Sequence, residues 1–393
     1  MDLSFLYGVL DLSFWGYFLV AFLMVQVTIM GVTVYLHRDA AHRSLELHPA
    51  LRHFFRFWIW VSSGMLTREW VAVHRKHHAF SDAPGDPHSP VVFGLKKVLF
   101  EGYELYAPES RNGETLVKYG RGTPDDWLER NIYSRHRNYG IILMAVVDLV
   151  LFGVPGIIMF AVQMMAMPFL AAGIVNGVGH HSGYRNFECE DAARNIVPWG
   201  LLLGGEELHN NHHAFPSSAK FSARRWEFDI GWLYIRVFQF LRLAKVTRIA
   251  PEPVKVELRP YIDIDNLRAV IVNRMHVLRE YSRKVTLPVL AAERARSAGE
   301  NLSIGVRRLL VRHPRLLDSK ANARLKEVLE RHVALKTVHE FRERLAQLWN
   351  GAHASNERLL AHLKEWCVQA EQSGIKVLQD FARSLRGYAL QPA

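Results

Sequence analysis

An unbroken apolar run near the N-terminus places the strongest constraint on how this chain can fold. Phe14 to Leu36, FWGYFLVAFLMVQVTIMGVTVYL, is 23 residues without a charged side chain. A helix of about 20 such residues crosses a bilayer core of about 30 Å, with every backbone polar group bonded inside the helix. The run ends at His37 and Arg38, and no Lys or Arg precedes it. The positive-inside rule therefore predicts one spanning helix that delivers His37 to the cytoplasmic side.

Two further apolar segments extend this topology. Ile141–Val178 is 38 residues long with Asp148 as its one charged residue, and Gly153–Gly156 (GVPG) breaks it near the middle. We expect a hairpin of two crossings there. Phe54–Leu66 is 13 residues long and contains Arg56, which favours an interfacial or re-entrant helix. The alternative, a short spanning helix, would separate the histidine-rich segments on its two sides.

The composition changes after about residue 250. Residues 251–393 show apolar residues at helical spacing among mixed charges, which predicts a soluble, all-helical extension that Pro288 and Pro314 divide. Residues 1–250 then form a membrane domain. The predicted fold is all-α: about three crossings and an interfacial helix, capped by a cytoplasmic helical domain, with a C-terminal helical extension.

Charge and cysteine content narrow the functional classes. The net charge of +11 and the pI of about 9.7 suit the anionic cytoplasmic face of a membrane, and a basic tail is also typical of nucleic-acid binding. Cys189 and Cys367 are the only two cysteines, too few for a disulfide framework or a built-in iron–sulfur cluster. The first 13 residues lack a basic stretch, so we expect no cleavable signal peptide.

Histidines recur in four short segments beside the apolar runs. HRKHH and HNNHH each place three histidines at i, i+3 and i+4, one face of a helix. NGVGH places an asparagine and a histidine at i, i+4, and HRDAAH places two histidines at i, i+5. The candidate metal-binding residues are His37, His42, His74, His77, His78, Asn176, His180, His209, His212 and His213.

Nine imidazoles exceed the four ligands that one tetrahedral zinc uses, so two metals fit better. Nitrogen ligands alone suit Zn, Cu, Fe or Ni, and a histidine-bound iron pair with open positions would perform oxidation. Asn176 is a weak ligand that would instead hold a metal-bound water. Four carboxylates are near enough in sequence to orient these histidines or to be solvated at the surface: Asp82, Asp86, Glu206 and Glu207.

The remaining histidines show no such pattern. We interpret His48, His53, His88 and His136 as ordinary residues. His181 would point about 100° away from His180 on a helix, and the same argument turns Asn210 and Asn211 away from the metal-binding face. Six aromatic residues are candidates to line or gate an apolar tunnel, although packing or interfacial anchoring is the commoner role of such residues: Phe54, Phe55, Phe57, Trp58, Trp60 and Trp70.

The ordered motifs HxxxxH, HxxHH, NxxxH and HxxHH resemble those of the membrane fatty-acid desaturases, in particular the Δ9 acyl-CoA (stearoyl-CoA-type) branch. HRKHHAFSDAPGDPHSP and EELHNNHHAFP are similar to its second and third histidine boxes, and GHHSGYRNFE to its bacterial members. The similarity covers about residues 14 to 245. It implies a diiron centre held by the nine histidines named above, with Asn176 contacting one iron through water.

The resemblance also implies an activity and its partners. The reaction would be the O2-dependent introduction of a cis double bond, at Δ9, into a saturated fatty acyl chain carried by CoA or by a phospholipid. The chain has no cluster cysteines, no GxGxxG before a helix and no CxxCH, so a separate ferredoxin-like or rubredoxin-like donor with its NAD(P)H reductase must supply electrons. We expect an integral protein of the bacterial inner membrane, with its active site and C-terminus in the cytoplasm.

One departure affects the topology. Eukaryotic members of that family have four spanning helices, whereas this N-terminus has room for one before HRDAAH. We therefore expect three crossings, or a short re-entrant piece near Phe5 to Leu10.

A fainter resemblance lies at the C-terminus, where residues 348–390 are similar to the end of some insertion-sequence transposases. No acidic catalytic triad or zinc motif accompanies it, so we expect a helical module without a nucleic-acid partner. Two other functions remain open at this point. A related diiron hydroxylase would place oxygen on an alkane, sterol or lipid, and a non-enzymatic metal-binding membrane protein would consume no O2.

Overall fold

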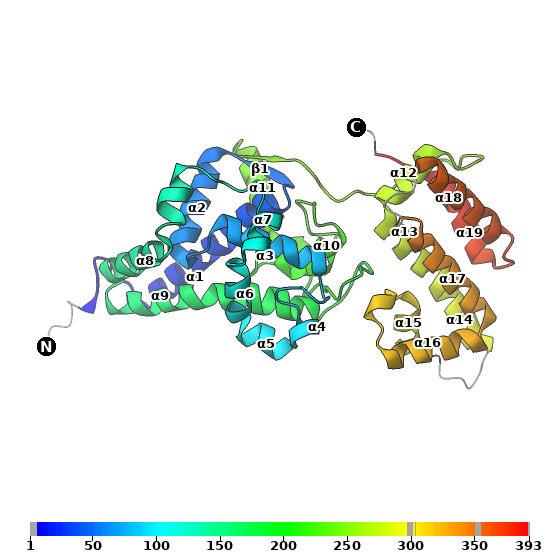
Figure 1. The fold of residues 1–393 in the computed structure, drawn as a ribbon, viewed down its shortest axis with the longest axis horizontal. Coiled ribbons are helices and arrows are strands. Elements are labelled where there is room, and N and C mark those ends of the chain that lie inside the picture. The colour runs from blue at the N-terminus through cyan, green and yellow to red at the C-terminus, as the bar shows by residue number, and fades with distance from the viewer. Residues whose placement is uncertain (1–5, 297–301, 303, 350–354, 392–393) are drawn as a thin grey trace. The chain divides into compact units, whose positions relative to one another are not determined.

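The computed structural model describes residues 6–296, 302, 304–349 and 355–391. It divides the chain into two compact units (Figure 1). Unit 1 comprises residues 1–185 and 191–250, and unit 2 comprises residues 186–190 and 251–393. Helices dominate both units, and the described strands are two or three residues long, which confirms the predicted all-α class.

Two helical segments of unit 1 are long and apolar enough to cross a membrane. The first is Phe14–Ala41, which begins as α1 (Phe14–Met30), capped by the Ser13 hydroxyl, and continues as a π-helix over Gly31–Ala41. The second, Val154–His180, contains α9 (Val154–Met167) and a π-helix over Pro168–Val175. These segments correspond to the predicted first crossing and to the second arm of the predicted hairpin.

The other arm of the hairpin is shorter. Helix α8 (Arg137–Phe152) has 16 residues, less than the typical spanning length of about 20. It packs against α9 through a sharp turn at Gly153, whose φ of +64° suits glycine. A Cβ at this position would lie 2.2 Å from the carbonyl oxygen of Leu6, so no larger residue fits the turn. Large apolar side chains on the outer faces of α1, α8 and α9 are exposed, as a lipid-facing surface requires.

The N-terminal segment does not form a re-entrant helix in its described part. Phe5 lies outside the described residues, and Leu6–Leu10 contains only a short turn. The backbone N–H groups of Val9 and Leu10 donate to the carbonyls of Val150 and Leu151, so this segment lies against the end of α8.

The segment expected to be interfacial forms α2 (Pro49–Ser63). Its 15 residues span about 22 Å, less than a bilayer core, and Gly64 ends it in the left-handed conformation. Arg56 is buried, and its guanidinium donates to Asp126 at 2.6 Å and to Glu129 at 3.0 Å. The charge within this apolar segment is therefore neutralised inside the protein.

Short elements of unit 1 then surround α3 (Thr67–Phe80). The chain continues from α3 through four short α-helices: α4 (Pro90–Phe93), α5 (Leu95–Phe100), α6 (Gly102–Ser110) and α7 (Gly113–Tyr119). A π-helix over Glu129–Tyr133 comes next. After Val178–His180, a 3-10 turn, the chain continues through β2 (Trp199–Gly200), the 3-10 turn Glu206–Leu208, α10 (His209–Ala214), β3 (Phe228–Asp229), α11 (Ile230–Phe240) and β4 (Ala244–Val246). Strand β1 (Leu45–Leu47) pairs antiparallel with β4, with Glu46 opposite Lys245, and β2 pairs parallel with β3.

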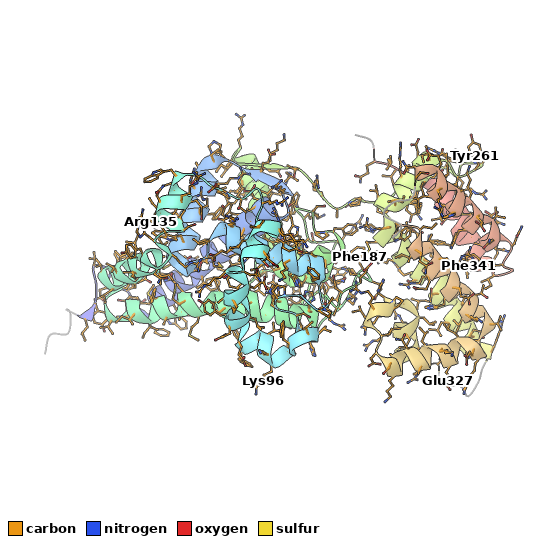
Figure 2. The ribbon with its side chains drawn as sticks, in the orientation of Figure 1. Lys96, Arg135, Phe187, Tyr261, Glu327 and Phe341 are labelled. Carbon is orange, nitrogen blue, oxygen red and sulfur yellow. The ribbon has the colours of Figure 1, made fainter. Side chains whose placement is uncertain are left out.

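Unit 2 is a helical assembly with its own apolar core. Its helices are α12 (Ile264–Val272), α13 (Arg274–Tyr281), α14 (Leu287–Arg296), α15 (Ile304–Val311), α16 (Ser319–Arg331), α17 (Val333–Gln347), α18 (Asn356–Glu371) and α19 (Lys376–Ser384). Strands β5 (Val254–Lys255) and β6 (Tyr388–Ala389) pair antiparallel. Tyr281, Phe341, Trp366 and Phe381 are buried together in the core. Phe341, on α17, is labelled in Figure 2.

The prediction that Pro288 divides unit 2 is wrong. The chain is helical from Arg274 to Arg296, and a π-turn over Ser282–Thr286 comes just before the proline. The wider turn changes the hydrogen-bond register at the point where proline lacks an N–H donor, so the helix continues. Pro314 does separate helices, because it begins a 3-10 turn between α15 and α16.

The buried Arg56 network predicts a stability effect. We expect Arg56→Ala to lower the free energy of unfolding by about 3–5 kcal/mol, because it leaves buried Glu129 without its cation. Arg130→Ala is the control, since that arginine pairs with Asp125 on the surface, and we expect an unchanged unfolding midpoint. Thermal unfolding in detergent measures both, and equal shifts would contradict this account.

Candidate metal centre

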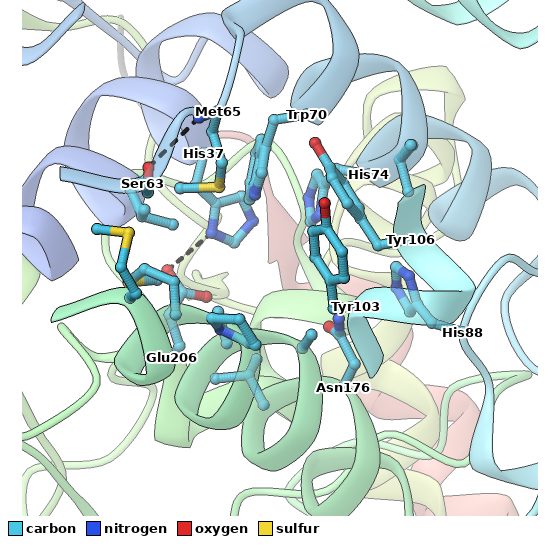
Figure 3. A pocket seen from close by; sticks show the side chains of 18 of the residues that line it. His37, Ser63, Met65, Trp70, His74, His88, Tyr103, Tyr106, Asn176 and Glu206 are labelled. Carbon is cyan, nitrogen blue, oxygen red and sulfur yellow. Dashed lines mark hydrogen bonds and ion pairs between the residues drawn. The ribbon is translucent and has the colours of Figure 1, made fainter. Parts of the chain in front are cut away.

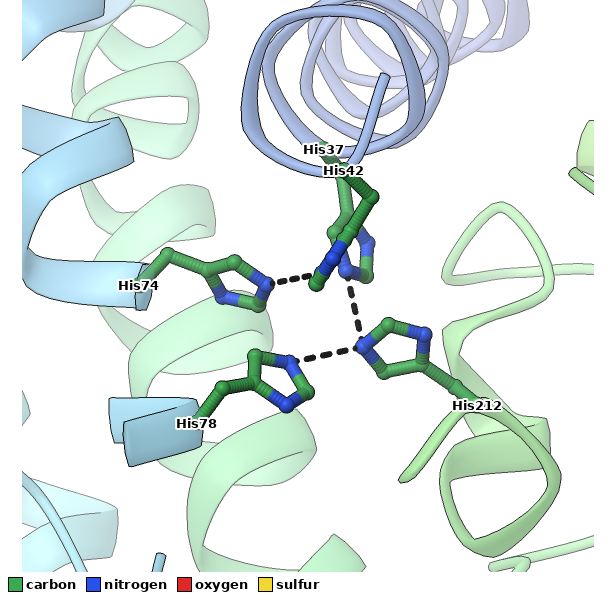
Figure 4. Close-up of side chains that lie close together, drawn as sticks. All are labelled: His37, His42, His74, His78 and His212. Carbon is green, nitrogen blue, oxygen red and sulfur yellow. Dashed lines mark hydrogen bonds between the residues drawn. The ribbon is translucent and has the colours of Figure 1, made fainter. Parts of the chain in front are cut away.

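The nine predicted histidines converge in two clusters. The first cluster is His37, His42, His74, His78 and His212, and the second cluster is His77, His180, His209 and His213. Within each cluster one ring nitrogen from every histidine lies within 4.8 Å of those of the others. Figure 4 shows the five imidazoles of the first cluster. Asn176 belongs to neither cluster and lines an adjacent cavity.

Two helices contribute to both clusters. Helix α3 carries HRKHH and directs His74 and His78, one turn apart, to the first cluster and His77 to the second. Helix α10 carries HNNHH and directs His212 to the first cluster, whereas His209 and His213 join the second. The i, i+3, i+4 spacing therefore sets the separation between two metal sites rather than filling one of them.

The π-helix explains the awkward spacing of the first motif. His37 and His42 are five residues apart, and the N–H of His42 donates to the carbonyl of His37 at 3.0 Å, the i+5 to i bond of a π-helix. Residues five apart are stacked on one face of this wider helix. Both imidazoles therefore reach the first cluster, with ring centroids 4.9 Å apart.

Four acidic side chains lie within hydrogen-bond distance of the Nδ1 atoms of four clustered histidines. The Nδ1 atoms of His37 and His77 lie 2.7 and 3.0 Å from Glu206 and Asp86. A carboxylate accepts the Nδ1 proton, which leaves the Nε2 lone pair directed into the cluster.

The other two carboxylates are Asp82, 2.8 Å from Nδ1 of His180, and Asp191, 2.9 Å from Nδ1 of His213. Asp191 was missed by sequence analysis, because it lies in an irregular loop with no fixed spacing from any motif. Among the described residues, Glu207 bonds to backbone rather than to a histidine: it accepts the N–H groups of Leu202, Leu203 and Gly205.

The Nε2 atoms of the clustered histidines lie close to one another. A neutral imidazole that carries its proton on Nδ1 has no proton on Nε2 to donate, so these atoms cannot all be hydrogen-bonded to one another. Nε2 of His212 lies 3.0 Å from Nε2 of His37 and 2.9 Å from Nε2 of His78, and Nε2 of His180 lies 3.0 Å from Nε2 of His209. The buried Nε2 atoms of His77 and His213 have no hydrogen-bond partner within the described residues. Two nitrogens bound at about 2.1 Å and at a right angle to one cation stand about 3.0 Å apart. The residues present therefore fit a pair of metal ions.

Burial favours the neutral, metal-binding form of five of these imidazoles. Burial, and then the neighbouring histidines, lower the pKa of His74, His78, His212 and His213 well below the ordinary value. Burial and the adjacent Arg75 lower the pKa of His42 to about 3. Neutral imidazoles at pH 7 offer their lone pairs to a cation without first losing a proton.

An apolar cavity of about 410 Å³ adjoins both clusters (Figure 3). His37, His74 and His209 lie on its wall together with apolar side chains such as Val32, Met164, Met167 and Ala171. Among the six predicted tunnel aromatics, Trp70 lines it and stacks on His74 with ring centroids 4.8 Å apart. The others lie elsewhere in the fold: Phe55 and Trp60 are buried in the core, Trp58 bonds to Thr28, and Phe54 and Phe57 are exposed.

His88 is a site residue that sequence analysis treated as ordinary. It is buried, lines the cavity, and stacks near His77 with ring centroids 4.6 Å apart. Its position two residues after Asp86 was the available signal. His48 and His136 do serve ordinary roles, capping α2 and stacking on Tyr139. Asn210 and Asn211 bond to Ala193 and Glu227 rather than joining a cluster.

Comparison with known proteins places the chain in a family. Residues 13–226 match the fatty acid desaturase family, and residues 267–391 match a transposase family, as the fainter C-terminal resemblance predicted. An sn-1 stearoyl-lipid 9-desaturase of Synechocystis sp. is 32% identical over 237 residues, 59% of this chain and 72% of that protein.

Two plant proteins show similar relations. Delta-9 acyl-lipid desaturase 2 of Arabidopsis thaliana is 29% identical over 251 residues, 61% of this chain and 76% of that protein. An acyl-CoA C20 Delta5-desaturase of Anemone leveillei is 30% identical over 253 residues, again 61% and 76%. With its family match over more than half of its length and its histidines gathered beside an apolar cavity, the chain belongs to the fatty acid desaturase family.

Proposed function

We propose that this protein introduces a cis double bond at Δ9 of a saturated fatty acyl chain, using O2 and a pair of irons. The observation that carries the proposal is the position of both histidine clusters on the wall of one apolar cavity. Desaturation removes two hydrogens from the acyl chain, and O2 takes up these hydrogens with two electrons and two protons to give two waters. This chemistry needs a cavity that excludes water. It does not need a polar pathway across the membrane, which metal transport would require.

We assign one iron to the first cluster and one to the second. The second cluster has four imidazoles against five in the first, and Asn176 on the cavity wall would complete its shell through a water. When bound, the reduced irons supply activation of O2 for attack on an unactivated C–H bond. The chain's own contribution is to hold the acyl chain against His37, His74 and His209 and to exclude bulk water.

Other residues fix the metal-binding geometry. Glu206, Asp86, Asp82 and Asp191 keep a proton on Nδ1 of their histidines, so that each Nε2 faces inward. Trp70 packs flat on His74 and limits the rotation of that ring while forming part of the cavity wall.

We place the protein in the bacterial inner membrane with its irons and C-terminus in the cytoplasm. In this proposal residues 1–250 form the desaturase domain and residues 251–393 a helical extension without a nucleic-acid partner. Support for the topology comes from the exposed apolar faces of α1, α8 and α9 and from Arg130, Arg135 and Arg137 beside the hairpin.

Product analysis tests the activity. Membranes containing the purified protein, a ferredoxin system, O2 and either stearoyl-CoA or stearoyl-phospholipid should yield the 9-ene by gas chromatography. The substrate pool that is consumed identifies the carrier, since the relatives include both acyl-lipid and acyl-CoA desaturases. Hydroxylated chains in place of olefins would contradict the proposal, and so would an absence of O2 consumption.

Loss of a single histidine should empty a metal site. We expect His77→Ala and His212→Ala to abolish desaturation and to lower bound iron, because each removes a buried ligand nitrogen. His136→Ala is the control, since His136 stacks on Tyr139 outside both clusters. Iron analysis and membrane fractionation measure the outcome, and full iron content in both variants would remove these residues from the site.

The carboxylate that sequence analysis missed makes a separate prediction. Asp191→Asn should weaken iron binding about 10- to 100-fold, because the amide oxygen stays with the N–H of Ala193 and Nδ1 of His213 then faces an NH2 group in place of a carboxylate oxygen. Asp125→Asn, at an exposed ion pair, is the matched control. Iron retained after a timed chelator challenge provides the measurement. Equal retention in both variants would show that Asp191 does not orient His213.

A further inference from the structure

The chain must receive its electrons from outside, and its surface indicates where they enter. The sequence holds only two cysteines, Cys189 and Cys367, and no cofactor motif for electron transfer. If the proposed function is correct, two electrons per turnover therefore reach the histidine clusters through protein contacts alone. The question is which histidines an external carrier can approach.

The first cluster is the one that reaches the protein surface. His42 and His78 are partly exposed and do not line the cavity, whereas all four histidines of the second cluster are buried. The remaining members of the first cluster either line the cavity or are fully buried. An approaching protein can thus come nearest to the ligand residues at this edge of the first cluster, which His42 and His78 form.

Three arginines surround this edge. Arg75, between His74 and His78 on α3, donates to the carbonyls of Ala40 and Ala41, just before His42, and to those of Tyr119 and Arg121. Arg43 follows His42 directly, and its Nη2 lies beside Gly122, next to Arg121 in the chain. We call Arg43, Arg75 and Arg121 the arginine patch.

The arginine patch carries uncompensated charge. Arg43 and Arg121 are exposed, and across the described residues none of the three arginines forms an ion pair with a carboxylate. Two acids line the same surface pocket as Arg43: Asp39 pairs with Arg52 at 2.6 Å, and Glu46 lies opposite Lys245 in the β1–β4 pair. Positive charge that is left unpaired beside exposed redox ligands favours a negatively charged partner.

We propose that a small acidic one-electron carrier, an iron–sulfur protein of the ferredoxin or rubredoxin class, docks on the arginine patch and delivers electrons through the exposed edges of His42 and His78. Each of two reduced carriers loses one electron per double bond formed, and O2 is the final acceptor. Redox partners of this kind bind weakly, through small interfaces that depend on charge. The proposal rests on the proposed desaturase activity and adds the site of electron entry.

Reversal of charge on the patch tests the docking directly. The probes are a purified acidic [2Fe–2S] ferredoxin and a rubredoxin, and the readout is the Kd for the full-length, iron-loaded protein in nanodiscs at low and high salt. We expect the double variant Arg43→Glu/Arg121→Glu to raise the Kd about tenfold or more at low salt and to flatten its salt dependence. Iron content at the wild-type level shows that the variant is folded.

The matched control variant is on unit 2, because the basic residues of that unit could also attract an acidic carrier. Residues 251–393 contain 25 Lys and Arg against 16 Asp and Glu, and Lys320 and Arg324 are exposed on α16. Lys320→Glu/Arg324→Glu makes the same change in net charge, and we expect a Kd within about twofold of wild type. A larger effect from this control, no effect from the patch variant, or no salt-dependent binding of either carrier would overturn the proposal.

A single-turnover measurement separates this proposal from the desaturase activity itself. Wild-type protein reduced chemically with dithionite, then exposed to O2 and the acyl substrate, needs no carrier. Olefin formed in this reaction supports the desaturase activity whatever the carrier experiment shows. If no olefin forms, the proposed function fails, and the Kd comparison still reports on the docking surface.

Discussion

Nine imidazoles, seven of them buried, can share one region of a protein only if their lone pairs have something to bind. In this fold four Nδ1 protons are committed to carboxylates, and two of the matching Nε2 atoms, those of His77 and His213, have no hydrogen-bond partner among the described residues. Buried unpaired polar atoms cost about 1–3 kcal/mol each, and a cation in each cluster removes that cost. The surrounding helices and loops are arranged so that the ring nitrogens of the two clusters lie close together beside the cavity.

Three helical elements carry most of the clustered histidines. A π-helix aligns His37 with His42, and two ordinary helices, α3 and α10, each supply ligands to both clusters. A rigid helix that carries histidines of both clusters would fix the separation of two metals bound there. It follows that a shift of either helix disturbs both sites together, which couples the two metal sites mechanically.

Much of this could be predicted from sequence, because periodic patterns report on helices and helices position the ligands. The apolar runs indicated α1 and α9, and the histidine spacing indicated all nine cluster members. The failures involve residues whose role depends on tertiary contacts. Asp191 and His88 are brought to the site by loops, and Glu207 bonds to backbone in place of a histidine. Pro288 is tolerated because of a π-turn that no propensity rule predicts.

The distribution of charge along the chain separates two electrostatic roles. Residues 1–250 are nearly neutral, with 24 Lys and Arg against 22 Asp and Glu, so the excess positive charge lies mainly in residues 251–393. A distributed excess attracts any anion, but salt screens it beyond about 8 Å under physiological conditions. It therefore raises the rate of encounter without selecting a docking position. Unpaired arginines in contact with the segment that carries His42 act at short range, where screening is weak, and can fix the orientation in which a carrier meets the ligand rings.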